Sequence, residues 1–236
     1  MTDWERSATA WIEVQGAHGD FSRRRVLDAP MLARVRAFKP ERLLDLGCGE
    51  GRFCRLLSEE VDTLVGLDPS PTLLARASEL GGAQFVLGHA EKMPFQSGSF
   101  DMVVSYLSIL DIEGIEAALD EIVRILRPGG RLLFANLTGF ATAADIKGSG
   151  WRVLPDGGRE IVVRRYLEPH SLVVRWKDIA VINWHRPLSF YMTQLLERDM
   201  TLKYFDEPAV LQPVDSKEAA YNNAPYQLIM EWQAPA

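Results

Sequence analysis

The chain has 236 residues, of which 47% are apolar and 25% are charged, a composition typical of a folded globular protein. No stretch approaches the roughly 18 consecutive apolar residues of a membrane span, and the first residues lack the apolar core of a secretory signal. We therefore expect a cytoplasmic protein that does not contact a membrane. The formal net charge of −6 disfavours a nucleic-acid partner, which would require a basic face. The length suits a single domain, residues 1–236.

Residues 1–39 are predicted to be helical. Trp4, Ala8 and Trp11 fall on one helical face, and a second helical segment begins near Ser22 and is interrupted at Pro30. The simplest interpretation is that the two tryptophans cover an edge of the core.

Residues 42–53 read RLLDLGCGEGRF and predict a strand, a tight turn and a helix. The turn has glycine at alternate positions, Gly47, Gly49 and Gly51. Glycine is needed where a Cβ would block either the backbone dihedrals or the close approach of a ligand. The turn is therefore interpreted as a cofactor-binding element. In an unrelated α/β domain the same pattern is simply a turn between strand and helix.

The glycine spacing bears on which cofactor is bound. A dinucleotide fingerprint requires G-x-G-x-x-G, but Arg52 stands where the third glycine would be, and Asp45 precedes the first glycine by two positions. A nicotinamide oxidoreductase is therefore disfavoured. Cys48 and Cys54 flank the turn, and we interpret them as packing residues in a reducing compartment, with no metal site.

Three further segments follow in chain order. The segment DTLVGLDPS predicts a strand that ends at Asp68, whose carboxylate can bind both hydroxyls of a ribose; the alternative is a turn that precedes a helix capped by Ser70. The segment from Gln84 to Ser105 reads QFVLGHAEKMPFQSGSFDMVVS. The segment from Ala117 to Leu137 predicts a helix, a Pro-Gly-Gly turn and a strand.

These four segments resemble, in the same order, the motifs of the class I S-adenosylmethionine (SAM) dependent methyltransferases, particularly small-molecule members of the type 11 and type 25 kind. The resemblance covers residues 40–137 well and the remainder loosely. It implies a Rossmann-like α/β fold, with a seven-stranded, mostly parallel sheet and helices on both faces. It further implies a helical cap at residues 1–39, a SAM-binding core at 40–137, a substrate-side insertion with a β-hairpin and a helix at 138–200, and last strands at 201–236.

The same resemblance implies that SAM, or its product S-adenosylhomocysteine (SAH), contacts a defined set of residues: Asp45, Gly47, Cys48, Gly49, Gly51, Asp68, Pro69, His89, Ala90, Glu91 and Ser105. His89 stands where the family usually has Asp. A neutral histidine accepts a hydrogen bond through only one ring nitrogen, so whether His89 supports adenine binding stays open.

The acceptor is expected to be a small molecule in a largely apolar pocket, with the residues Trp11, Phe21, Tyr106, Trp151 and Tyr191 as candidate lining and an arginine of Arg23 to Arg25 beside them. Methyl transfer is an in-line displacement that needs mainly alignment of the reacting atoms. If a general base is used, the candidates are His18, Asp111 and His185, each of which also has a structural interpretation; His170 is a further one.

The remainder of the chain predicts strands and one helix. The segments around 159–169 and 171–188 alternate as strands about a turn at Glu168-Pro169-His170, which indicates a hairpin. Ser189 is predicted to cap a helix that reaches Arg198, and residues 200–208 and 226–234 supply the last two strands.

Two other functions stay open at this point. The first is a protein of the same fold that binds SAM or SAH without transferring a methyl group, and the second is an RNA or protein methyltransferase. We expect a monomer or a homodimer, and the identity of the acceptor and of the methylated atom is not determined by the sequence.

Overall fold

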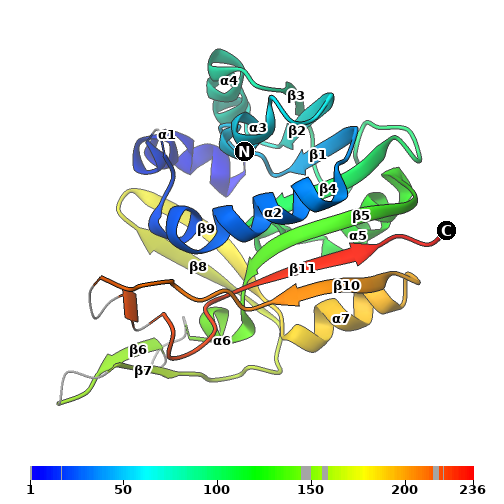
Figure 1. Cartoon of the computed structure of the whole chain (residues 1–236). Helices are drawn as coiled ribbons and strands as arrows, with labels where there is room; N and C mark the ends of the chain where they lie inside the picture. Colours follow the sequence, from blue (N-terminus) through cyan, green and yellow to red (C-terminus); the bar gives the residue numbers. More distant parts are fainter. Residues whose placement is uncertain (1, 17, 145–149, 156–158, 215–217, 220) are drawn as a thin grey trace.

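The computed structural model describes residues 2–16, 18–144, 150–155, 159–214, 218–219 and 221–236 (Figure 1). The main sheet has seven strands: β1 (Arg42–Leu46), β2 (Thr63–Asp68), β3 (Gln84–Leu87), β4 (Phe100–Tyr106), β5 (Leu126–Leu137), β10 (Thr201–Asp206) and β11 (Gln227–Gln233). Their order across the sheet is β10-β11-β5-β4-β1-β2-β3.

Strands β1 to β5 are parallel, and β10 and β11 are antiparallel to their neighbours. The predicted seven-stranded, mostly parallel sheet is confirmed. The strand order reverses between β1 and β4, and in open α/β sheets ligands bind beyond the carboxyl ends of the strands at such a point.

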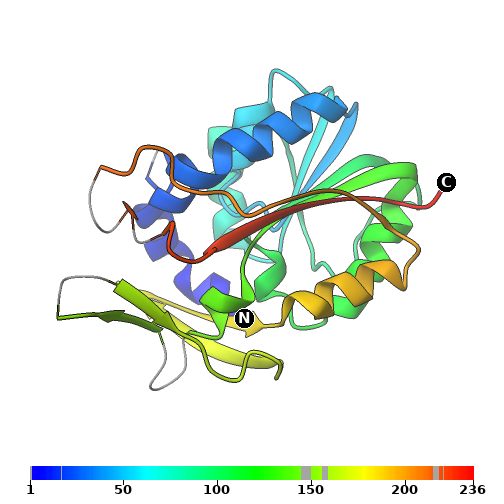
Figure 2. The ribbon, with the colours of Figure 1, turned by 60° about the horizontal axis from the view of Figure 1, so that its bottom comes forward.

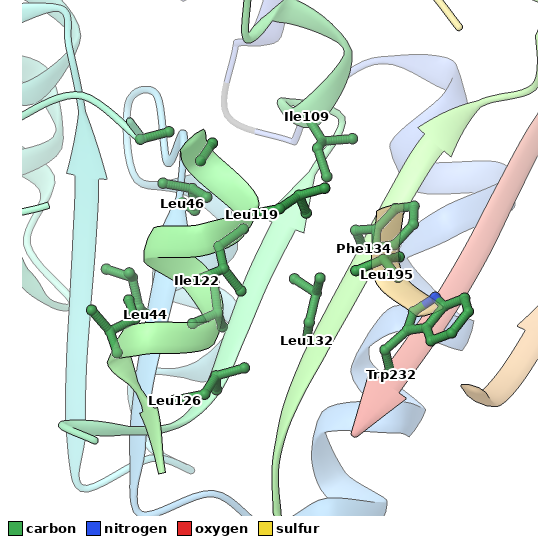
Figure 3. Packing of buried hydrophobic residues seen from close by; sticks show 14 of the residues in the cluster. Leu44, Leu46, Ile109, Leu119, Ile122, Leu126, Leu132, Phe134, Leu195 and Trp232 are labelled. Carbon is green, nitrogen blue, oxygen red and sulfur yellow. The ribbon is translucent and has the colours of Figure 1, made fainter. Parts of the chain in front are cut away.

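Helices cover both faces of the sheet, as predicted. Successive side chains of a strand point to opposite faces, so Leu44 joins a cluster beneath α5 (Ile115–Ile125) and α7 (Leu188–Leu196), whereas Leu43 joins a second cluster on the other face. Figure 3 shows the first cluster, in which Leu119 and Ile122 of α5 and Leu195 of α7 pack toward the strands. Helices α2 (Asp28–Phe38), α3 (Arg52–Leu57) and α4 (Pro71–Leu80) contribute to the second cluster.

The N-terminal region is helical, as expected. It consists of α1 (Asp3–Gln15), a π-helix η1 (Arg23–Leu27) and α2. The predicted interruption at Pro30 is wrong, because residues 21–38 are helical without a break; the irregular turn lies just before the proline, in the π-helix η1.

The hairpin in the second half is built differently from the prediction. Strand β6 (Gly150–Val153) pairs with β7 (Arg159–Val162), and β8 (His170–Trp176) pairs with β9 (Ile179–His185). The turn is therefore at Lys177-Asp178, where Lys177 has a φ of +49°, and the expected turn at Glu168-Pro169-His170 is wrong. The alternating pattern of β8 would suit pairing with the strand before it or with the strand after it. Tertiary contacts therefore decide which of the two it pairs with.

Two shorter elements complete the region around the hairpin: a 3-10 turn η2 (Ile109–Asp111) after β4, and α6 (Gly139–Thr142) after β5. Helix α7 begins after Pro187 and has no side-chain cap, so the predicted capping role of Ser189 is wrong: this residue lies inside the helix. Figures 1 and 2 show α1 beside the β8–β9 hairpin, where the Ser7 hydroxyl donates to the carbonyl of Ala180.

Candidate active site

A cavity of about 590 Å³ lies at the carboxyl ends of β1, β2 and β4. Helix α1 and strand β9 contribute Trp4, Trp11, Ile182 and Trp184 to its walls. It brings together most of the residues proposed for the cofactor: Asp45, Gly47, Cys48, Gly49, Asp68, Pro69, His89, Ala90 and Glu91. This volume falls within the range typical of small-molecule sites.

The glycine turn after β1 adopts a backbone that only glycine tolerates easily. Gly47, Gly49 and Gly51 have φ values of +73°, +57° and +78°. A Cβ on Gly47 would collide with Ser108, whereas a Cβ on Gly49 would point toward the cavity, 3.8 Å from the indole nitrogen of Trp11. Gly51 does not line the cavity, since a Cβ there would meet the ring of Phe85 at 2.7 Å. Its glycine serves the packing of α3.

Asp45 is the most enclosed carboxylate of the site. Its side chain is 1% exposed; the Cys54 thiol donates to Oδ2 at 3.3 Å, and Oδ1 is buried without a hydrogen-bond partner in the described ranges. Burial raises its pKa to about 7, and the nearby charges of Asp68 and Glu50 act in the same direction. An unpartnered buried carboxylate oxygen beside a cavity fits a ligand that supplies an ammonium group.

Asp68, at the end of β2, holds the glycine turn and also lines the cavity. Its Oδ2 accepts from the amide of Gly49 at 2.9 Å and its Oδ1 from the amide of Ser70 at 2.9 Å, so it fixes the glycine turn. It also lines the cavity, where burial raises its pKa to about 6 although the two amides act in the opposite direction. Each carboxylate oxygen keeps a lone pair for a ligand hydroxyl.

Helix α1 is fastened across the cavity at three points. Glu5 accepts hydrogen bonds from the hydroxyls of Ser70 and Thr72, at the start of α4. The indole N–H of Trp4 donates to Asp111 at 3.0 Å, and Ser7 bonds to β9. The three contacts hold α1 as one wall of the cavity.

Arg23 is the member of the Arg23 to Arg25 run that reaches the cavity. It forms an ion pair with Asp20, and its guanidinium carbon lies 5.1 Å from the ring centre of Trp11 and 5.5 Å from that of Tyr106. The Tyr106 hydroxyl donates to Asp28 at 2.8 Å, and burial raises the pKa of this phenol. The ring of Tyr106 therefore faces the cavity, and its hydroxyl is turned away into a hydrogen bond.

Asp111 also lines the cavity. It accepts one hydrogen bond from Trp4 of α1 and another from the side-chain amide of Asn183 of β9. Burial raises its pKa to about 7, while the two hydrogen bonds lower it. This residue therefore joins three elements that are far apart in the sequence.

Several candidates from the sequence lie outside the cavity. Tyr191 is buried in the core, with its ring 6.1 Å from that of Phe134, and Phe21 packs against Tyr221. His185 is fully buried, between the Thr142 hydroxyl at 2.6 Å and the Tyr166 carbonyl at 2.8 Å. His18 is exposed, and the Ser105 hydroxyl is hydrogen-bonded to that of Ser108 at 2.7 Å. The side chain of Trp151, a further candidate, lies outside the described part of the structure.

Sequence reasoning missed several residues of the cavity wall, among them Trp4, Gln15, Ser108, Ser171 and Ile182. The helical face shared by Trp4 and Trp11 did carry a signal: it was interpreted as covering an edge of the core and, through the family resemblance, as part of a cap. The residues of β8 and β9 reach the cavity because the hairpin folds back toward α1, which no local pattern indicates. In the ranges that the structure describes, no group of three or more His, Cys, Asp or Glu side chains is arranged to hold a metal ion. No described helix has both the length and the apolar character of a membrane span.

Comparison with known proteins shows the fold and a likeness to methyltransferases. Residues 44–134 match the family model of a methyltransferase domain. Among curated relatives, malonyl-[acyl-carrier protein] O-methyltransferase of Serratia marcescens is 34% identical over 122 residues, which are 51% of this chain and 47% of that protein. The phthiotriol/phenolphthiotriol dimycocerosates methyltransferase of Mycobacterium leprae is 35% identical over 102 residues, 41% of this chain and 38% of that protein. The chain thus spans about half the length, or less, of these relatives.

Among solved structures, an S-adenosylmethionine dependent methyltransferase from Mesorhizobium loti superposes with a TM-score of 0.80 at 24% sequence identity. The superposition covers 92% of this chain and all of that chain. The agreement extends well beyond residues 44–134, so the fold outside the family model is also shared.

Proposed function

We propose that this chain, whose residues 44–134 match a methyltransferase domain, is a class I SAM-dependent methyltransferase that transfers the methyl group of SAM to a small-molecule acceptor bound in the cavity. The observation that carries this proposal is the unpartnered Oδ1 of Asp45 beside the glycine turn, on the cavity wall. Burying a carboxylate oxygen without a hydrogen-bond partner costs free energy in the empty protein. This oxygen lies where the family resemblance places the amino group of SAM.

The proposed position of the cofactor is based on the charged residues near the carboxyl ends of β1 and β2. Asp45 would hold the ammonium group, and Arg23, whose positive charge lowers the pKa of Asp45, offers its remaining N–H groups to the cofactor's carboxylate. Asp68 would accept from the ribose hydroxyls. His89 and Ala90, in the segment after β3, border the place left for adenine.

Bound SAM supplies an electrophilic methyl group on a sulfonium. The work of the protein is then to hold the acceptor in line and to exclude water, and alignment alone can account for about 7 to 11 kcal/mol of a barrier. Helix α1 and β9 enclose the cavity, and Trp4, Leu107, Ile182 and Trp184 give it apolar walls. These walls support an acceptor with an apolar body.

A small-molecule acceptor is supported by the enclosure of the cavity by α1 and β9. One relative is named for a malonyl-[acyl-carrier protein] acceptor and the other for phthiotriol/phenolphthiotriol dimycocerosates, and this chain covers less than two thirds of the length of either. The acceptor is therefore proposed from the cavity rather than from the relatives' names.

Calorimetric titration with SAH, with NAD as the matched control ligand, tests the proposal. We expect binding of SAH but not of NAD. Replacing Asp68→Asn should weaken SAH binding roughly 10- to 100-fold, because a hydrogen bond to a charged group is lost. Asp62→Ala, at an exposed site outside the cavity, should bind as the wild type does.

The proposal is wrong if the folded wild-type protein binds no SAH, or if the Asp68 and Asp62 variants bind it equally well. Circular dichroism spectra of each variant establish that the fold is retained, since Asp68 also fixes the glycine turn.

A further inference from the structure

Asp111 is a half-buried carboxylate for which the cavity wall provides no ion-pair partner in the described ranges. Its two hydrogen-bond donors, the indole of Trp4 and the amide of Asn183, are both neutral groups. Because an enclosed charge without a counter-charge is costly, such a group is informative where it faces a cavity.

The cations of the cavity are already engaged. Arg52 is committed to Asp28 through two nitrogens and to the His18 carbonyl through the third. Arg23 is paired with Asp20 and lies over Trp11 and Tyr106. Arg23 lowers the pKa of Asp111 from a distance, and Asp68 raises it. In the proposed cofactor site, the remaining N–H groups of Arg23 donate hydrogen bonds to the cofactor's carboxylate.

The acidic residues Asp3, Glu50, Glu91 and Glu113 also line the cavity, and its three other aspartates fall into two groups. Asp45 and Asp68 come from the ends of β1 and β2, where the cofactor is proposed to lie. Asp111 comes from η2 and is held by α1 and β9, which form the other wall. A carboxylate acceptor would meet Asp111 as a like charge, whereas an acceptor that carries an ammonium group would supply the missing counter-charge.

We propose that Asp111 selects an amine acceptor, by pairing with its ammonium group, and that Trp4 and Asn183 are positioning residues that aim this carboxylate. This inference rests on the proposed function, since it takes the ends of β1 and β2 as the cofactor site. The acceptor class is an amine on an apolar body, packed against Ile182 and Trp184.

The same carboxylate is in place to take the proton that the reaction releases. The ammonium nitrogen gives one proton to an oxygen of Asp111 and so regains its lone pair, which forms the new N–C bond. The S–C bond breaks with its electron pair remaining on sulfur, and the proton passes from Asp111 to solvent. Atoms and charge balance without another reactant.

The test is a binding measurement on SAH-loaded protein at pH 8, with three probes of the same skeleton: phenethylamine, 2-phenylethanol and phenylacetate. We expect phenethylamine to bind best and phenylacetate least. Asp111→Asn should weaken phenethylamine binding roughly 10- to 100-fold and leave 2-phenylethanol within about twofold, since only the charged pair is lost. Glu116→Gln, on the exposed side of α5, should bind all three probes as the wild type does.

The inference is overturned if phenethylamine fails to bind, if phenylacetate binds as well as phenethylamine, or if Asp111→Asn leaves the amine affinity unchanged. SAH titration of the same samples separates the two proposals: loss of SAH binding in the wild type refutes the proposed function, whereas intact SAH binding without amine selection refutes only the role of Asp111. If Asp111→Asn does not fold, the wild type decides, because amine binding must then weaken as the pH falls through about 7, where Asp111 becomes protonated.

Discussion

Three aspartates define the chemistry of the cavity at the scale of single residues: Asp45 and Asp68 are buried, and Asp111 is half-buried. Burial is the largest cause that raises the pKa of each, to about 7 for Asp45 and Asp111 and to about 6 for Asp68. Raised pKa values of carboxylates that line one cavity are typical of functional sites. Their hydrogen-bond donors set how easily each one ionises.

Removing one of these hydrogen-bond donors should shift the pH at which the affinity for an amine declines. In the wild type, amine binding to the SAH-loaded protein should fall as the pH drops through about 7, because protonated Asp111 is neutral. The Asn183 amide lowers the pKa of Asp111, so Asn183→Ala should move this decline to higher pH. The affinity of the amine is measured at steps between pH 5.5 and 9. A decline that stays in place would show that Asn183 does not act through Asp111.

At the scale of elements, α1 behaves as a wall that is tied on at its first turns. Glu5 bonds to Ser70 and Thr72 at the start of α4, and hydrogen bonds from these groups lower its pKa. Trp4 and Ser7 add contacts to η2 and β9. Since α1 contributes Trp4 and Trp11 to the cavity, we expect it to slow the release of a ligand that lies against them.

Loosening this tie should therefore change ligand kinetics more than stability. Glu5→Gln keeps the shape of the side chain but removes the charge and one acceptor oxygen. We expect SAH to dissociate roughly three- to tenfold faster, with little change in the melting temperature. Glu13→Gln, on the exposed face of α1, is the control. Stopped-flow displacement measures the rate, and equal rates in both variants would exclude α1 as the element that retains the ligand.

At the scale of the whole molecule, two separate cores support a sheet whose carboxyl edge carries uncompensated charge. The clusters beneath α5 and α7 on one face, and beneath α2 and α3 on the other, fix where β1, β2 and β4 end. Asp45, Asp68 and Asp111 are placed by those strand ends and by the turn after β4. The packing of the two cores therefore offsets the unfavourable free energy of enclosing these carboxylates.

The empty protein should lose stability as the pH rises from about 5.5 to 8. The folded-state pKa values of Asp45, Asp68 and Asp111 lie above those of the unfolded chain, so the folded state binds more protons in this window. His185 acts in the opposite sense, because burial lowers its pKa and stability gained from it rises with pH. Carboxylates with lowered pKa, such as Asp20, matter only below about pH 4.

Melting temperatures at pH 5.5 and pH 8 test this balance. The wild type should melt lower at pH 8, and Asp111→Asn should reduce the difference. A melting temperature that is constant or rises between the two values would contradict it.

The amino-acid sequence determined the core from residue 40 to 137 because its signals are local. Alternate glycines after an apolar run require a tight turn, and Asp45 and Asp68 sit beside strands whose carboxyl ends meet at one edge of a parallel sheet. Such short-range patterns place residues without knowledge of distant contacts. The positions of Gly49 and His89 in one cavity follow from the same reasoning.

Tertiary structure alone decided the acceptor wall. Trp4 and Asp111 are 107 positions apart, and Asp111 and Asn183 are 72 apart, so no periodicity could bring them together. The pairing partner of β8 was likewise undetermined by the sequence, because an alternating run can pair with either neighbouring strand. In the structure β8 pairs with β9, which packs against α1. Tyr191 was placed in the core by the fold of α7 against β5. Local chemistry determined where the cofactor is proposed to bind, whereas long-range packing determined which side chains would meet the acceptor.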